Sequence, residues 1–403
     1  MRQNLIDFDK FKITYSVGHA DILNNMVNVP ALIPFSDTIT DFLNALSKNL
    51  LSKPQTKAYP DVMTLAFWMR KASMIHLKNR FVVDDLIRLG RGVVFHIAPS
   101  NVAVNYAYSF ITGLVCGNAN VVRLPSKDFA QVDIINNAIN EVLEVYPNLK
   151  PYIALVHYGH DNAINDAMSA MADVRVIWGG DNTITEIRNS PLKARAAEIT
   201  FADRYSLAVI DADTYLKIDN KSKVAIDFWN DTYLSDQNAC TSPRVILWLG
   251  EKKEEAKAEF WHHVNNLVEK QYEIYGVQVV NKLTSRSLLA VAKDGVKVEH
   301  AEDNLITRVH VEKLDVDLME FKDNSGYFIE CDGESVFDLK DICNDSRCQT
   351  ISYIGDKHMF KQLLTSGISG VDRVVPMGKT MDFDFIWDGN NLFERMTRTI
   401  AIS

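Results

Sequence analysis

Short apolar runs alternate with helical segments from residue 91 to residue 178, and this alternation restricts the fold more than any other feature of the sequence. The apolar runs are 91–98, 120–124, 153–157 and 174–178, and the helical segments are 103–116, 132–145 and 162–171. A strand, a helix and a second strand in close succession form a βαβ unit, which requires a right-handed crossover and a parallel sheet. The repeated alternation therefore predicts a doubly wound α/β domain.

Further helices are predicted on both sides of this region. They are expected at 36–52, where a Ser/Asp/Thr cluster precedes apolar residues at helical spacing, and at 60–79 as one amphipathic helix. In the second half, helical patterns at 219–234 and 252–275 flank the apolar run 245–249. A second α/β domain is therefore expected there.

The domain boundaries carry no obvious linker. No segment rich in Pro, Gly or Ser separates the two halves, so we place one domain with its N-terminal helices over 1–211 and a catalytic domain over 212–372. The tail 373–403 is rich in aromatic and β-branched residues. We expect it to return to the first domain or to form an arm that contacts another subunit.

Composition limits the environment of the protein and its partners. The 403 residues are 47% hydrophobic, which supports two sizeable cores, and the net charge of -9 argues against nucleic acid or an anionic membrane as the main partner. Five irregularly spaced cysteines favour reduced thiols over a disulfide framework. No apolar stretch is long enough for a membrane span. We therefore expect a cytoplasmic protein.

Cys240 is the most informative single residue. It follows a polar turn and directly precedes the apolar run 245–249, with Ala239 and Thr241 as small neighbours. A thiol in such a position can be reached by a carbonyl group, and its thiolate form would be the nucleophile. A buried structural cysteine is the competing interpretation.

Three separated motifs give the chain a family resemblance. They are the strand and turn FHIAPSNVAV at 95–104 with GNANVVRLPSK at 117–127, the cysteine segment DQNACTSPR at 236–244, and the tail segment PMGKTMDFDFIWDG at 376–389. The first resembles the cofactor-domain signature of the aldehyde dehydrogenase superfamily. Together the three resemble the acyl-CoA reductase family of the bacterial fatty-acid reductase complex, the LuxC family.

The resemblance implies a fold and a catalytic pair. The expected fold is aldehyde-dehydrogenase-like, with a doubly wound cofactor-binding domain and a second α/β catalytic domain. Cys240 would be the nucleophile, and the Asn101 side chain with the Cys240 backbone N–H would stabilise the oxyanion. Taken alone, Asn101 after Pro99-Ser100 also fits a turn residue.

The same resemblance places the cofactor. Ser126 and Lys127 match the segment that meets the adenine ribose, and a lysine there would pair with a 2′-phosphate, with Arg123 close by. Gly179 and Gly180 match a turn beside the pyrophosphate, where glycine allows close backbone approach. We therefore expect NADPH, although surface Lys and Arg are also commonly only solvated and no GxGxxG motif is present.

One departure from the superfamily bears on the reaction. Hydrolytic aldehyde dehydrogenases use a Glu to activate water, and this chain has Thr200 at the matching position. A register shift of two or three residues would place Glu198 or Asp203 there instead. Without that carboxylate, an acyl-enzyme should survive long enough to be reduced.

The function expected from these features is NADPH-dependent reduction of a fatty acyl-CoA or acyl thioester to the aldehyde through an S-acyl-cysteine. The donor is expected to be acyl-CoA or an acylated partner enzyme such as an acyl-protein synthetase or transferase, and the protein is expected to form a homo-oligomer. Two alternatives remain: an aldehyde or semialdehyde dehydrogenase acting oxidatively, and a non-reducing acyl-carrier subunit. Cys343, Cys348 and His358 are too few for a zinc site, and His96 is expected to be a satisfied core residue.

Overall fold

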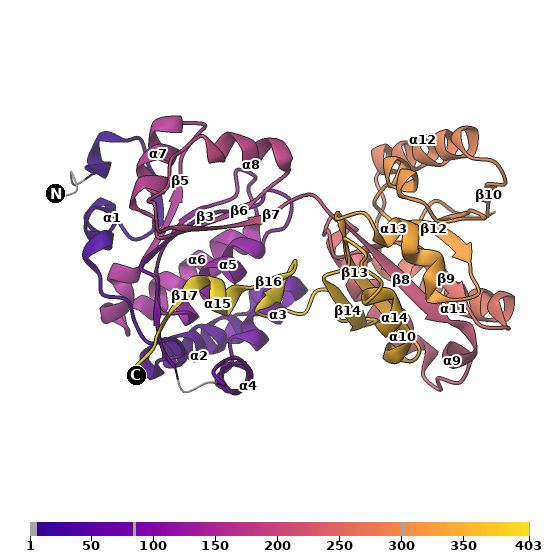
Figure 1. The fold of residues 1–403 in the computed structure, drawn as a ribbon, viewed down its shortest axis with the longest axis horizontal. Helices are drawn as coiled ribbons and strands as arrows, with labels where there is room; N and C mark the ends of the chain where they lie inside the picture. The colour runs from indigo at the N-terminus through magenta and orange to yellow at the C-terminus, as the bar shows by residue number, and fades with distance from the viewer. Residues whose placement is uncertain (1–5, 84–85, 300–302, 403) are drawn as a thin grey trace. The chain divides into compact units, whose positions relative to one another are not determined.

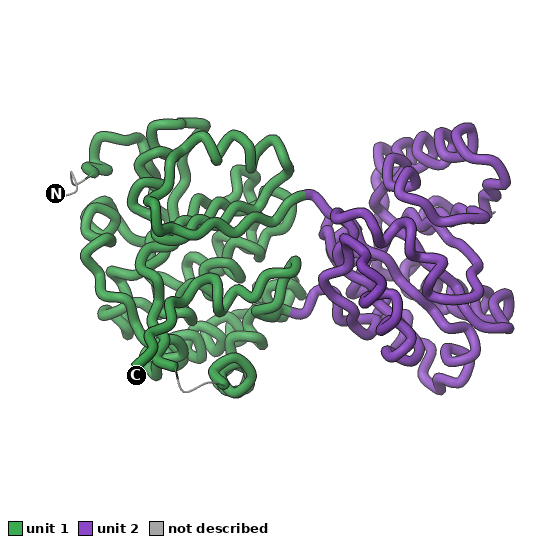
Figure 2. The backbone as a smooth tube through the Cα atoms, in the orientation of Figure 1, with its two compact units in different colours: residues 1–202, 383–403 green, residues 203–382 purple. Residues whose placement is uncertain are grey.

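The computed structural model describes residues 6–83, 86–299 and 303–402. The chain forms two compact units, residues 1–202 with 383–403, and residues 203–382 (Figure 2). The boundary expected at 211 therefore lies at 202, because the strand at 205–211 joins the second sheet. The second unit extends to 382 rather than 372, because the strand at 373–376 belongs to the same sheet. The last 21 residues belong to the first unit.

The first unit is built on a six-stranded sheet in the order β1-β5-β4-β3-β6-β7. Its strands are β1 (Thr14–Val17), β3 (Val93–Ile97), β4 (Ala119–Arg123), β5 (Ile153–His157), β6 (Val174–Trp178) and β7 (Ala197–Phe201). All neighbouring strands are parallel except β1, which pairs antiparallel with β5. The chain runs outward from β3 through β4 to β5, then returns to β6 and β7 on the other side of β3. This is the predicted doubly wound topology.

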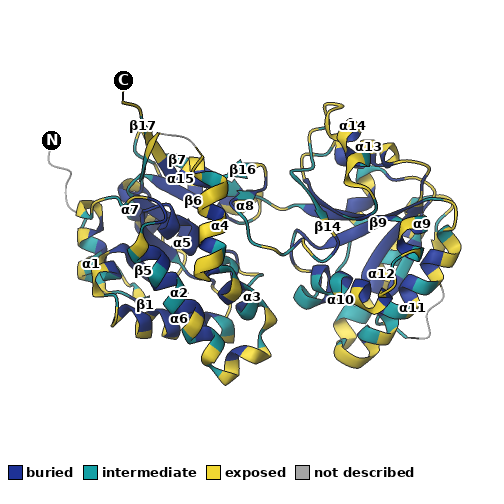
Figure 3. Cartoon of the chain, turned by 90° about the horizontal axis from the view of Figure 1, so that it is seen from below, coloured by how far each residue is buried: buried dark blue, intermediate teal, exposed yellow. Residues whose placement is uncertain are grey.

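Helices cover both faces of this sheet, as Figures 1 and 3 show. The helices of the first unit are α1 (Ala20–Asn25), α2 (Asp37–Ser52), α3 (Pro60–Trp68), α4 (Lys71–Phe81), α5 (Asn105–Val115), α6 (Ala130–Leu143), α7 (Asn162–Met171), α8 (Asp181–Arg188) and α15 (Leu392–Met396). Because both faces are covered, β3 and β6 are buried at every position, which explains their nearly continuous apolar sequences.

The single helix expected over 60–79 is wrong. The structure has α3 and α4 with a break at Met69 and Arg70, where Arg70 adopts an extended ψ of 145°. The backbone N–H of Lys71 donates to Asn44 Oδ1 of α2 (3.2 Å), and the Lys71 ammonium pairs with Asp41 of α2 (2.8 Å). These contacts start a new helix against α2, which apolar periodicity alone could not indicate.

The C-terminal segment completes the first unit. Strand β17 (Thr397–Ile400) pairs antiparallel with β2 (Ile87–Gly90), and β15 (Ile386–Trp387) forms a small hairpin with β16 (Asn390–Asn391). Phe385, Trp387 and Phe393 from this segment are buried in the core of the first unit. Apolar burial therefore explains why the tail returns to the first unit.

The second unit contains a seven-stranded sheet in the order β10-β11-β12-β9-β8-β13-β14. Its strands are β8 (Tyr205–Asp211), β9 (Pro243–Leu249), β10 (Lys297–Val298), β11 (Thr307–His310), β12 (Tyr327–Asp332), β13 (Cys348–Ile354) and β14 (Arg373–Pro376). The helices are α9 (Ala212–Leu216), α10 (Lys221–Asp231), α11 (Lys253–Gln271), α12 (Gly276–Ala292), α13 (Lys340–Cys343) and α14 (Phe360–Leu364). Only β10 is antiparallel to its neighbour within this sheet.

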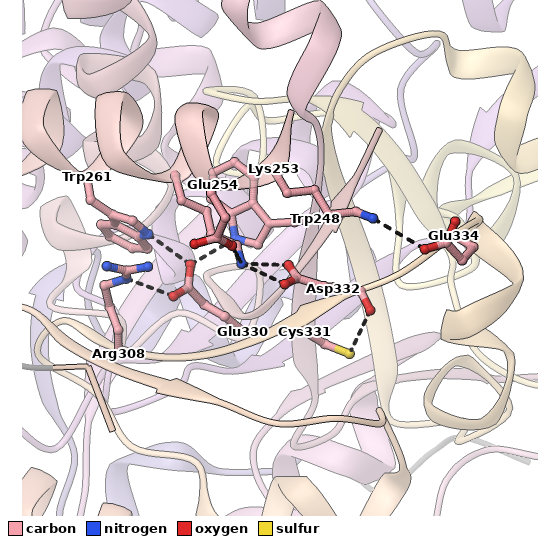
Figure 4. A network of polar contacts seen from close by, with 10 residues as sticks. Trp248, Lys253, Glu254, Trp261, Arg308, Glu330, Cys331, Asp332 and Glu334 are labelled. Atoms are coloured by element: carbon pink, nitrogen blue, oxygen red, sulfur yellow. Dashed lines mark hydrogen bonds and ion pairs between the residues drawn. The ribbon is translucent and has the colours of Figure 1, made fainter. Parts of the chain in front are cut away.

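A buried carboxylate, Glu330 of β12, joins elements of the second unit (Figure 4). Glu330 is 1% exposed, and it accepts hydrogen bonds from the indole N–H groups of Trp248 and Trp261, both at 2.8 Å. Arg308 of β11 donates to the other carboxylate oxygen at 2.7 Å. A buried charge with three donors is well compensated, so this network fixes α11 against the sheet.

His96 lies in the core of the first unit, as the sequence predicts. Its ring nitrogens lie 2.7 Å from Ser109 Oγ and 3.0 Å from Asn120 Oδ1. Asn120 Oδ1 can only accept, so His96 Nε2 donates to it, and Nδ1 of the neutral ring accepts from the Ser109 hydroxyl. The Ser109 oxygen in turn accepts from Trp178 Nε1. Complete burial lowers the pKa of His96 to about 4, despite the opposing bond to Asn120. His96 is therefore a neutral structural residue.

The burial of His96 predicts that the free energy of unfolding falls as the pH is lowered. The unfolded state takes up a proton at a pKa near 6.5 and the folded state near 4, so the stabilisation is complete above 6.5 and is lost as the pH falls toward 4. Between pH 7 and pH 5 the loss should be ~2 kcal/mol. Between pH 7 and pH 5, the free energy of unfolding of His96→Gln, measured in urea, should therefore fall by ~2 kcal/mol less than that of the parent. An equal loss in the variant and the parent would contradict the assignment.

Candidate active site

The carboxyl ends of the first sheet carry the predicted cofactor residues. Strand β3 ends at Ile97 and is followed by the turn with Asn101, whereas β6 ends at Trp178 and is followed by Gly179 and Gly180. These two strands are neighbours from which the chain proceeds in opposite directions. Doubly wound sheets bind ligands at this switch point, outside the carboxyl ends of the strands.

The glycine turn leaves room for a ligand. Gly180 is the N-cap of α8, and a Cβ built on it would have no protein atom within 4 Å. A Cβ on Gly179 would lie 3.0 Å from Thr183, which is closer than most Cβ contacts. The acidic Asp181 in the first turn of α8 opposes an anion there. The space beside the Gly180 backbone therefore leaves this turn accessible to a ligand.

The turn after β4 carries Ser126 and Lys127, and both are exposed. The Ser126 hydroxyl lies 3.0 Å from the Ser100 hydroxyl, which ties this turn to the turn that contains Asn101. The Lys127 ammonium lies 5.2 Å from the centre of the Phe129 ring. The hydrogen bond joins the predicted cofactor turn at Ser126 to the turn that contains Asn101, and Lys127 places an exposed cation on the first of these turns.

Arg123, the last residue of β4, is held by its neighbours. Its Nη2 donates to the carbonyl of Gly159 at 3.3 Å, and its guanidinium lies over the ring of Tyr158 at 4.7 Å. Both contacts come from the loop after β5. Lys127 is therefore better placed than Arg123 to meet a phosphate.

Cys240 lies in the second unit, in the loop that leads into β9. All five cysteines are among the described residues, and Cys240 is the partly exposed one, whereas Cys116, Cys331, Cys343 and Cys348 are buried. Burial raises the pKa of Cys331 to about 11 and that of Cys116 further. These thiols stay protonated near neutral pH, so Cys240 is the candidate nucleophile. Its pairing with Asn101, which belongs to the first unit, stays a prediction.

A buried cation accompanies the cysteine. Arg244 is 7% exposed and donates to the backbone carbonyls of Gln237 and Asp323, each at 2.6 Å. Burial lowers its pKa, and the charges of Asp203 and Cys240 oppose that effect. Arg244 is thus a buried cation four residues after Cys240, and the two residues interact electrostatically.

The sequence analysis missed the residues that shape the turn before Cys240. Asp236 and Gln237 both have a φ of 52°, the left-handed region that costs a non-glycine residue about 1–3 kcal/mol. Gln237 is completely buried. A polar side chain so close to a buried strand was the available signal, but two of its hydrogen-bond partners, Gly326 and Tyr327, are remote in the sequence.

The first part of the tail motif packs beside the cysteine loop. Asp231, at the end of α10, accepts hydrogen bonds from the backbone N–H groups of Gly378 (2.7 Å) and Thr380 (3.0 Å) and from the Thr380 hydroxyl (2.9 Å). Burial raises the pKa of Asp231 to about 7, against these donors. One residue further, Met381 Sδ accepts from the Thr241 hydroxyl at 3.1 Å. The motif thus contacts the residue next to Cys240.

Thr200, Glu198 and Asp203 are the residues that the sequence offers at the position of a water-activating Glu. Thr200 is half-buried in β7, and Glu198 in the same strand forms ion pairs with Arg175 (2.5 Å) and Arg188 (2.7 Å). Burial alone would raise the pKa of Glu198, but the hydrogen bonds and charges of the two arginines outweigh it and lower the pKa. Glu198 is therefore a weak base, and Asp203 is exposed and paired with Lys322 at 3.4 Å.

Comparison with solved structures defines the class of fold. The chain is similar to an NAD-dependent benzaldehyde dehydrogenase from Corynebacterium glutamicum, with a TM-score of 0.62, 12% identity, and coverage of 98% of this chain and 95% of that one. It is also similar to an NADP-dependent glyceraldehyde-3-phosphate dehydrogenase from Bacillus halodurans, with a TM-score of 0.59, 15% identity, and coverage of 90% and 85%. The fold is that of the aldehyde dehydrogenases, as predicted.

The sequence matches the acyl-CoA reductase (LuxC) family over residues 86–399, and the chain belongs to this family. It is 26% identical over 187 residues to long-chain acyl-protein thioester reductase 2 of Photobacterium leiognathi, covering 43% of this chain and 37% of the relative. It is 21% identical over 310 residues to the long-chain acyl-protein thioester reductase of Vibrio harveyi, covering 72% and 59%. The matched segments span less than two thirds of each relative.

Within residues 6–83, 86–299 and 303–402, no group of three or more His, Cys, Asp or Glu side chains is arranged to hold a metal ion. No helix in the same ranges is long and apolar enough to cross a bilayer.

Because Cys240 is more exposed than the other four cysteines, a thiol reagent should react with it selectively. Iodoacetamide should alkylate Cys240 first in the native protein, because the other four thiols are buried. Mass spectrometry of peptides after brief exposure should find the label on Cys240, and unfolding in urea should expose all five. Faster labelling of any buried cysteine in the native state would contradict this order.

Proposed function

We propose that this protein reduces an acyl thioester to the aldehyde, with NADPH as reductant and an S-acyl intermediate on Cys240. The observation that carries the proposal is the partial exposure of Cys240 in a fixed loop beside the cation Arg244, while the other cysteines are buried. Membership of the acyl-CoA reductase family supports this reaction.

The first step is transfer of the acyl group to the enzyme. The Cys240 thiolate attacks the thioester carbonyl, a new C–S bond forms, and the bond to the donor sulfur breaks, so that the donor leaves as a thiolate and takes a proton from water. The carbonyl oxygen becomes negatively charged in between. Its donors would be the Asn101 side chain and the Cys240 backbone N–H, and loss of one such donor costs about 2.7–4 kcal/mol in barrier.

The second step is reduction of the acyl-enzyme. Bound NADPH would supply the hydride that reduces the acyl carbon. Cys240 then leaves as a thiolate, which releases the aldehyde and restores the free enzyme. Gly179, Gly180, Ser126 and Lys127 would hold the cofactor, and the open space above Gly180 is compatible with it.

Reduction is favoured over hydrolysis by the residues of β7. A water-activating base needs a carboxylate that is not already engaged, and the Glu198 carboxylate is held by two arginines. Thr200 has no carboxylate. This argues against the oxidative dehydrogenase that would release a free acid.

Two acyl donors fit the proposed reaction, acyl-CoA and an acylated protein. The names of the two relatives specify acyl-protein thioesters, so we propose an acylated partner protein as one donor and acyl-CoA as the other. Both present the same thioester carbonyl to Cys240.

Replacing the nucleophile tests the whole proposal. Cys240→Ala should lower aldehyde formation from acyl-CoA and NADPH by more than about 10⁴-fold and abolish the acyl adduct in the intact-protein mass. Full aldehyde formation by this variant would refute the assignment. In the parent enzyme, a stable adduct without NADPH oxidation would instead indicate an acyl carrier, and free acid as product would indicate the oxidative alternative.

Replacing the proposed phosphate partner tests the cofactor. Lys127→Glu should lower the ratio of kcat/KM for NADPH to that for NADH by about tenfold or more, because a carboxylate repels the 2′-phosphate. Arg123→Glu serves as comparison, and its effect should be smaller because Arg123 is engaged by Gly159 and Tyr158. An unchanged ratio in Lys127→Glu would exclude this role.

A further inference from the structure

The loop that carries Cys240 is closed by a side chain. Gln237 Nε2 donates to the carbonyl of Pro243 at 3.1 Å, and Cys240 lies midway between these residues. Arg244, the next residue, donates to the Gln237 carbonyl at 2.6 Å. Both ends of the loop are therefore fixed to each other, with the cysteine at its centre.

The Gln237 amide uses its full hydrogen-bonding capacity in the core. Its oxygen accepts from the N–H groups of Gly326 (2.7 Å) and Tyr327 (3.0 Å), and its nitrogen donates to the carbonyls of Pro243 (3.1 Å) and Tyr327 (3.2 Å). Proline has no N–H to offer a neighbouring strand. The amide therefore supplies donor and acceptor where the pairing of β9 with β12 runs out, and it is completely buried there.

The backbone on the other side of Gln237 is strained and braced. Asp236 and Gln237 are consecutive left-handed residues with φ of 52°, a conformation that needs support from its surroundings. The Gln237 N–H donates to the carbonyl of Thr232 at 2.9 Å. The Asp236 carboxylate accepts from the Tyr272 hydroxyl and from Gln278 Nε2 of α12.

The contacts of Asp236, Gln237 and Arg244 fix the orientation of the peptide groups on either side of Cys240. The carbonyl of Ala239 accepts from the N–H of Ser242 at 3.0 Å, and the carbonyl of Cys240 accepts from the Ser206 hydroxyl at 2.8 Å. In a planar trans peptide the N–H points opposite to the carbonyl. The Cys240 N–H therefore points away from the turn, in a direction that the closed loop maintains.

We propose that Gln237 is a positioning residue for the nucleophile: its amide fixes the loop so that the Cys240 thiol and backbone N–H act together on the thioester. The inference rests on the proposed function, because the backbone N–H matters only if an oxyanion forms there. Cys240 remains the catalytic residue, and Gln237 acts through it.

The test compares two reactions of the same thiol. Gln237→Met keeps the length of the side chain but removes its four hydrogen bonds, so single-turnover acylation of Cys240 by acyl-CoA should slow by about 100-fold. Alkylation by iodoacetamide, which needs no oxyanion donor, should change far less. The Kd for NADPH should be unchanged. Equal slowing of both reactions would indicate general loosening of the loop and overturn the proposal, as would wild-type acylation by a folded variant.

A second variant, Gln237→Glu, has nearly the same shape as the parent residue and tests the amide donor through the pH dependence of acylation. It also keeps the proposal testable if Gln237→Met folds poorly. The Gln237→Glu carboxyl can still accept from Gly326 and Tyr327, but only its protonated form can donate to a facing carbonyl. The ratio of its acylation rate to that of the parent should therefore rise as the pH is lowered. A ratio that does not depend on pH would contradict the role of the amide donor.

Matched controls separate this inference from the proposed function. Gln131→Met makes the same change in the first unit, where Gln131 donates to Asp61, and should leave both rates unchanged. If the parent enzyme is not acylated at Cys240, the proposed function fails. If the parent is acylated and Cys240→Ala is not, but Gln237→Met matches the parent, only the positioning role fails.

Discussion

Parallel strands covered by helices on both faces leave only their ends for chemistry, and this constraint organises both units. The faces of β3, β6 and β9 are used entirely for packing, because every residue in these strands is buried. Side chains that meet a ligand must therefore come from the loops at the strand ends. The predicted cofactor residues after β4 and β6 follow this rule at the carboxyl ends of the first sheet.

Cys240 follows the same constraint at the opposite end of a strand. Cys240 precedes β9 rather than following it. A loop that follows a parallel strand usually leads into a helix, whose N-terminus fixes the loop, but the loop of Cys240 leads into a strand. Side chains fix this loop instead. The Gln237 amide donates to the Pro243 carbonyl and so closes the loop. Arg244 donates to the Gln237 carbonyl, and the Ser206 hydroxyl donates to the Cys240 carbonyl. The loop around Cys240 thus has a fixed conformation, at the cost of two strained backbone residues.

The polar residues of the core divide into those that hold the fold and those available for chemistry. His96, Glu330 and Glu198 are all ionisable and have donors or acceptors arranged around them, yet each is fully engaged by neighbours in its own unit. Their engagement makes them poor catalysts. Cys240 and Lys127 differ because they keep contact with solvent, and exposure is the property that a substrate or cofactor requires.

The sequence by itself determined the doubly wound first domain and the family, because apolar periodicity and short motifs are local properties of the chain. The role of Cys240 stays a prediction. The sequence also predicted the neutral role of His96 from its place inside a strand. It could not find the break between α3 and α4, the boundary at residue 202 or the amide clamp of Gln237. Those depend on partners distant in the sequence, namely Asn44 for α4, β9 and β13 for β8, and Gly326 and Tyr327 for Gln237. Only tertiary packing brings such partners within hydrogen-bonding distance.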